Sequence, residues 1–112
     1  MTLFEQIATR EIPARIVAET DEWLAFHDVN PQAPVHVLIV PKRLISRLDQ
    51  AAEEDTALLG RMLLAAPGIA KTLGVAESGF RIVINNGRDA GESVPHLHLH
   101  LLGKRPLAWP PG

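Results

Sequence analysis

A chain of 112 residues with a formal net charge of −2 is long enough for one hydrophobic core and too short for two. Apolar residues make up 46% of it, but no apolar run approaches the roughly 20 residues that a transmembrane helix requires. The absence of cysteine excludes disulfides and thiolate zinc sites, and the scattered lysines and arginines give no basic patch for nucleic acid. The N-terminal residues lack a signal-peptide pattern, so we expect a cytoplasmic protein that binds neither membrane nor nucleic acid.

The first half of the chain predicts one short helix and three strands. Residues Thr2–Thr9 place apolar side chains on one helical face, and Ile12 ends this segment because Pro13 follows it. The strands expected next are Arg15–Glu19, Trp23–His27 and, after a loop stiffened by two prolines, Val35–Val40.

The second half predicts one long helix and two more strands. The helix covers about residues 52–73, with acidic residues in its first turn, Gly74 as its C-cap and a kink expected at Pro67. A strand at Phe80–Asn85 and a polar, glycine-bearing loop follow, and the last strand is Val94–Leu102.

These elements predict an α+β fold with an antiparallel sheet of about five strands, one long helix and a short N-terminal helix. We expect one domain over residues 1–112, with residues 104–112 as a C-terminal tail. The long helix is apolar around most of its circumference, so its second face is expected to meet another subunit in a homodimer. The residues concerned are Leu58, Leu59, Met62, Leu63, Leu64, Ile69 and Leu73.

Residues 96–102 read His-Leu-His-Leu-His-Leu-Leu. On a strand this alternation places His96, His98 and His100 on one face and the leucines on the other. His36 lies near the start of another predicted strand, which could bring a fourth imidazole close.

Three interpretations of this histidine pattern are open: a solvated polar face, a metal site, and catalysis by imidazole itself. The loop from Asn85 to Ser93 can offer backbone N–H groups and a hydroxyl to a phosphate group. Neighbouring histidines disfavour each other's charged form, which keeps an imidazole neutral and nucleophilic. Both observations favour phosphate chemistry.

The run at residues 96–102 resembles the signature of the histidine triad family. Further segments are similar to histidine triad nucleotide-binding proteins, so that the resemblance covers nearly the whole chain: residues 24–36, 39–42, 91–93 and 109–112. Three residues depart from the family's usual pattern: Pro95 before the triad, Glu92 in place of glutamine, and Pro67 in the long helix.

The resemblance implies roles for the polar residues. His98 corresponds to the family's nucleophile, which forms a covalent nucleotidyl-imidazole. His100 would contact phosphate oxygens, His96 would orient the network, and His36 matches a fourth active-site histidine. The phosphate-binding loop would comprise Asn85, Gly91, Glu92, Ser93 and Val94.

The nucleoside-binding residues are also carried over from the family. Asp28 would hold the ribose hydroxyls, and Trp109 would reach the partner subunit's active site. The apolar slot for a purine would be formed by Ile7, Ile12, Phe26, Val29 and Leu38, and His27 is a further substrate-binding candidate.

The resemblance therefore implies a metal-independent hydrolase without a cofactor, acting on purine nucleoside phosphoramidates or other AMP or GMP conjugates. His100 favours hydrolysis, because the transferase branch of the family has glutamine at this position. The alternatives are a nucleotide-binding regulatory module with incidental hydrolysis and a histidine-rich metal site.

Overall fold

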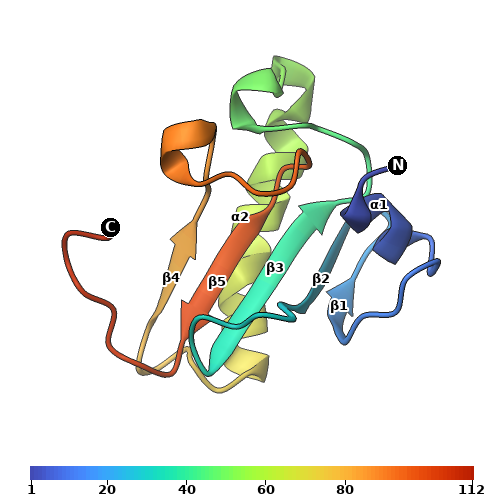
Figure 1. Cartoon of the computed structure of the whole chain (residues 1–112). Helices are drawn as coiled ribbons and strands as arrows, with labels where there is room; N and C mark the ends of the chain where they lie inside the picture. The colour runs from blue at the N-terminus through green and yellow to red at the C-terminus, as the bar shows by residue number, and fades with distance from the viewer.

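The computed structural model describes residues 1–112 and has five strands in one antiparallel sheet (Figure 1). The strands are β1 (Ile16–Glu19), β2 (Trp23–His27), β3 (Val35–Pro41), β4 (Phe80–Val83) and β5 (Leu99–Gly103). Their order across the sheet is β1-β2-β3-β5-β4. The predicted α+β class, with about five antiparallel strands, is confirmed.

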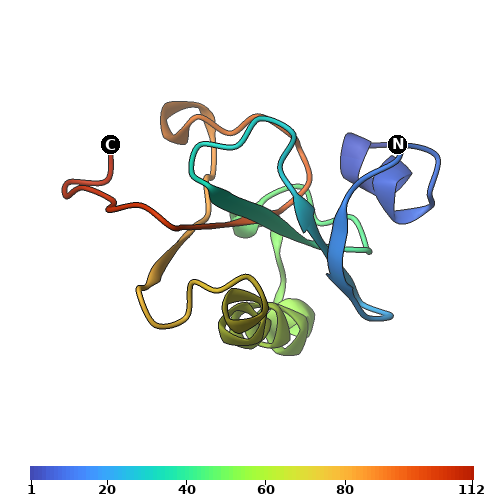
Figure 2. The ribbon, with the colours of Figure 1, turned by 90° about the horizontal axis from the view of Figure 1, so that it is seen from below.

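Two helices lie on opposite faces of this sheet, as Figure 2 shows. The long helix, α2 (Thr56–Thr72), covers one face, and the short helix, α1 (Leu3–Ala8), lies on the other near β2. Each helix closes its own apolar cluster against the sheet. Neither has the length and apolar character needed to cross a membrane.

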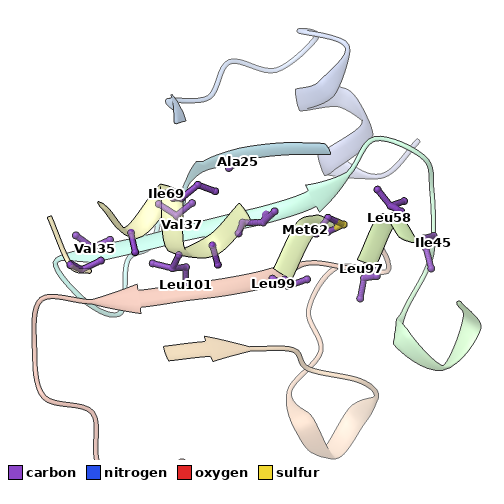
Figure 3. Packing of buried hydrophobic residues seen from close by; sticks show 14 residues of the cluster. Ala25, Val35, Val37, Ile45, Leu58, Met62, Ile69, Leu97, Leu99 and Leu101 are labelled. Atoms are coloured by element: carbon purple, nitrogen blue, oxygen red, sulfur yellow. The ribbon is translucent and has the colours of Figure 1, made fainter. Parts of the chain in front are cut away.

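The larger cluster lies between α2 and the middle of the sheet (Figure 3). Val37 and Ile39 of β3 pair directly with Leu101 and Leu99 of β5, and all four side chains pack with Met62 of α2. All five are buried at 1% exposure or less. The leucines of the histidine-rich segment therefore form the core, as their alternation predicts.

Helix α2 is shorter than the predicted range of about 52–73. The Asp55 carboxylate accepts the backbone N–H of Ala52 at 2.8 Å and pairs with Arg43, which closes a separate 3-10 turn before the helix. Leu73, rather than the predicted Gly74, is the C-cap of the helix, and Gly74 follows it with a positive φ of 76°, a conformation common directly after helix ends. Pro67 lies on the exposed side within one continuous helix.

The last strand begins five residues later than the predicted Val94, so His96 and His98 precede β5 and only His100 lies on it. Prolines explain the difference, because Pro95 has no N–H for a ladder and Pro41 would stand opposite Leu97 if the register continued. The Leu97 N–H instead donates to the Ile45 carbonyl at 2.7 Å. The expectation that three histidines share one strand face is therefore wrong, because only His100 lies on the strand and the His96 ring lies inside the protein.

Candidate active site

The strand register gathers one row of side chains on the sheet face opposite α2. Phe26 of β2 pairs with Leu38 of β3, and Leu38 pairs with His100 of β5. Directly paired residues point to the same face, so the three form a continuous row from the apolar to the polar part of the site. His36 lies two residues before Leu38 and shares this face.

A slot of about 320 Å³ opens along this row. Its walls are mostly apolar and come from α1, the segment after it, and β2. The polar groups Asp28, Ser93, His98 and His100 lie among its lining residues. An apolar slot with a few convergent polar groups is the usual form of a small-molecule binding site.

Hydrogen bonding fixes the protonation of the His98 ring. Its Nδ1 lies 2.7 Å from the backbone carbonyl oxygen of His96. A carbonyl oxygen can only accept, so Nδ1 carries the proton and donates it. The other nitrogen, Nε2, therefore keeps its lone pair, and the ring lines the slot.

His96 is held at both ring nitrogens in a site with 1% exposure. Its Nε2–H donates to the Pro41 carbonyl at 2.7 Å, and its Nδ1 lies 2.8 Å from the Thr2 hydroxyl. The ring does not line the slot. His96 contacts the His98 ring through its backbone carbonyl oxygen, which accepts the His98 Nδ1–H.

His36 and His100 form a second hydrogen-bonded pair. The Gln32 backbone N–H donates to His36 Nδ1 at 3.0 Å, so the proton of His36 is on Nε2. That Nε2–H donates to His100 Nδ1 at 2.9 Å, with Asp28 Oδ2 3.4 Å away. This direction leaves the Nε2 of His100 protonated and free to donate to a ligand.

Burial keeps His36, His96 and His100 uncharged near neutral pH. Desolvation, followed by the charges of His98 and His36, lowers the pKa of His100 to about 4. Desolvation is also the main cause that lowers the pKa of His36 and of His96 below the usual range. The hydrogen-bond directions assigned above require this neutral form.

Comparison with known proteins identifies the family. The model of the HIT (histidine triad) domain matches residues 9–107. The chain belongs to the HIT family. A HIT-like protein from Synechocystis is 58% identical over 111 residues, which are 99% of this chain and 96% of that protein.

Solved structures of HIT proteins share the fold along the whole chain. A HIT family hydrolase from Legionella pneumophila is 45% identical, with a TM-score of 0.97 and complete coverage of both chains. A histidine triad nucleotide-binding protein from Candida albicans is 30% identical, with a TM-score of 0.86 over 98% of this chain and 83% of that one. This HIT protein thus has the fold of family members described as hydrolases and as nucleotide-binding proteins.

The slot of this HIT protein brings together most of the residues predicted for the site. They are Ile7, Ile12, Phe26, His27, Asp28, Val29, Leu38, Ser93, Val94, His98 and His100. The remaining predicted residues do not line it: His36, His96, Asn85, Gly91, Glu92 and Trp109. Of these, Glu92 has its carboxylate occupied by the Gly87 N–H at 3.0 Å and by Arg47 at 2.8 Å.

Two of the three interpretations of the histidine pattern do not fit this geometry. His36, His96 and His98 are each at most 5% exposed, which excludes a solvated polar face. Donor atoms of Asp28, His36 and His100 lie within 4.8 Å of one another, as a metal site would need. A metal-bound histidine, however, normally donates its other N–H, whereas His36 Nδ1 accepts one.

Helix α1 supplies contacts that sequence reasoning missed. The Phe4 ring lies edge-on to His98 at 5.1 Å and to His96 at 5.7 Å between ring centroids. Phe4 and Leu3 also line the slot. Phe4 and the two histidines are about 90 positions apart in the sequence, and no local sequence pattern predicts such a contact.

The lowered pKa of His100 predicts a specific loss of stability in acid. The unfolded chain binds more protons than the folded one between about pH 4 and 6.5, so stability is complete above 6.5 and falls as pH drops through that window. We expect urea unfolding of His100→Gln to show a shallower loss over this range than the wild type. Parallel curves for the two proteins would contradict the assignment.

Proposed function

We propose that this HIT protein hydrolyses purine nucleoside phosphoramidates and related nucleotidyl conjugates, releasing a nucleoside monophosphate. The observation that carries the proposal is the His98 ring, whose Nδ1–H is held by a backbone carbonyl while its Nε2 lone pair remains available in the slot. Family members described as hydrolases support the same reaction class.

The chemistry takes two steps. His98 Nε2 attacks phosphorus, a P–N bond to the enzyme forms, and the bond to the leaving group breaks with its electron pair. The amine takes up a proton from solvent as it leaves, so that it departs as a neutral amine. Water then attacks phosphorus and loses a proton to solvent, the P–Nε2 bond breaks with its electron pair returning to Nε2, and His98 regains its neutral form.

The remaining polar groups would stabilise the negative charge on the phosphate. His100 offers an Nε2–H whose direction is set by the chain from Gln32 through His36. The Ser93 hydroxyl and the backbone N–H groups of Ser93 and Val94 would donate to the phosphate oxygens, as preorganised donors do in a developing anionic centre. No step in this scheme requires a metal ion.

The apolar part of the slot would hold the base. Phe26, Leu38, Ile7 and Ile12 present hydrocarbon and aromatic surface, which accepts a purine by shape. Asp28 is at the polar end, where its second carboxylate oxygen would accept the ribose hydroxyls. Its first oxygen already accepts the Asn30 N–H at 2.9 Å.

The first prediction concerns His98. His98→Ala should lose turnover of an adenosine phosphoramidate by on the order of a thousandfold or more, because the nucleophile is gone. It should still bind AMP by calorimetry, since the slot is unchanged. Near wild-type turnover in the variant would contradict the proposal.

Two controls sharpen this experiment. A chelator should leave wild-type activity intact, whereas inhibition that zinc reverses would point back to a metal site. A wild-type protein that binds AMP but turns over no phosphoramidate would point to a nucleotide-binding regulatory module.

The second prediction concerns Asp28. Hydrogen bonds from a carboxylate to two ribose hydroxyls contribute on the order of 1–3 kcal/mol, so Asp28→Asn should raise the KM for a ribonucleotide substrate. The matched control is a 2′,3′-dideoxy substrate, whose KM should not respond to the substitution. Equal changes for both substrates would show that Asp28 acts only through His36 or its loop.

A homodimer is part of the proposal. On α2, Leu64 is 80% exposed and Leu63 is 45% exposed, which leaves an apolar strip on the side away from the sheet. A two-fold partner would cover this strip with its own copy. Trp109 is 82% exposed and does not line the slot of its own chain, so it is free to act at the partner's site.

The third prediction tests this assembly. Sedimentation at micromolar concentration should give a dimer, and Leu64→Glu should shift it toward monomer. Truncation after Pro106 should change selectivity among leaving groups. A wild-type monomer would contradict the dimer, and unchanged selectivity would contradict the role given to Trp109.

A further inference from the structure

The N-cap residue of α1 is joined directly to the histidine triad. The Thr2 hydroxyl accepts the Glu5 backbone N–H at 3.1 Å and lies 2.8 Å from His96 Nδ1. Because His96 Nε2–H donates to the Pro41 carbonyl, Nδ1 is an acceptor and the Thr2 proton points at it. Each donor in this series of hydrogen bonds therefore has one acceptor.

The series of hydrogen bonds continues from His96 to His98, the proposed nucleophile. The carbonyl that holds the His98 Nδ1–H belongs to His96, whose ring is fixed by Thr2 on one side and by Pro41 on the other. Phe4, two residues after Thr2, packs edge-on against both imidazole rings. A ring anchored at both nitrogens restricts the rotation of its own backbone, and hence the direction of its carbonyl.

We propose that Thr2 is a positioning residue for His98. Its hydroxyl holds the neutral His96 ring, and the His96 carbonyl in turn holds the Nε2 lone pair of His98 toward the slot. The effect on turnover rests on the proposed hydrolytic function, whereas the effect on the imidazole protons does not. Helix α1 thus contributes to the orientation of the nucleophile as well as to the slot wall.

Three variants separate this role from simple helix capping. Thr2→Val keeps the side-chain shape but removes the hydroxyl, so that His96 Nδ1 loses its donor. Thr2→Ser keeps the hydroxyl and is the conservative rescue. Glu5→Ala removes the reciprocal capping bond from the Thr2 backbone N–H, which is 2.8 Å long, and leaves the Thr2–His96 contact in place.

Turnover is the first measurement. Thr2→Val should lower kcat by about tenfold, the effect of leaving one buried acceptor unsatisfied beside the nucleophile. Thr2→Ser should stay within about twofold of wild type. Glu5→Ala should raise KM through a looser slot wall and leave kcat within about twofold. A kcat that falls equally in Glu5→Ala and Thr2→Val would reduce Thr2 to a helix cap and overturn the proposal.

Imidazole NMR of the ligand-free protein is the second measurement, and it does not depend on activity. Wild type, Thr2→Ser and Glu5→Ala should show a His98 Nδ1–H that exchanges slowly with water. In Thr2→Val this signal should broaden or exchange faster. A His98 signal unchanged in Thr2→Val would overturn the proposal, whether or not the wild type hydrolyses phosphoramidates.

Discussion

The carbonyl oxygen of His96 is the acceptor on which the site depends. Because it cannot donate, it selects one of the two neutral forms of His98 and aims the unprotonated nitrogen at the slot. Pro41 and Gln32 impose the same kind of choice on His96 and His36, each through one backbone group. Three main-chain groups thus set the proton positions of neighbouring imidazoles, which suits His36 and His96, whose charged forms are penalised by burial.

This site is coupled to the core through a single stretch of chain. Leu97, Leu99 and Leu101 pack in the cluster beneath α2, while His98 and His100 turn to the other face and line the slot. A close-packed core leaves little freedom for a backbone whose alternate side chains it holds. The imidazoles are therefore carried on a segment whose leucines pack into the core on the α2 side, while Phe4 of α1 packs against His98 on the opposite side.

Periodicity made much of this arrangement predictable. The alternation of residues 96–101 predicted a core face and a histidine face, and the family resemblance identified most residues of the slot. The start of β5 was mispredicted because Pro41, on a strand more than 50 residues away, prevents pairing at Leu97. The contacts of Thr2 and Phe4 with the triad, and the pairing of Arg47 with Glu92, depend on tertiary structure and have no local signature.

The most direct test is to trap the covalent state. Wild-type protein mixed briefly with an adenosine phosphoramidate and quenched in alkaline denaturant should yield one modified peptide, heavier by a single adenylyl group, with the group on His98. Fragmentation by mass spectrometry distinguishes His98 from His96 and His100 within that peptide. Turnover without any adduct, or an adduct on another histidine, would contradict nucleophilic catalysis by His98.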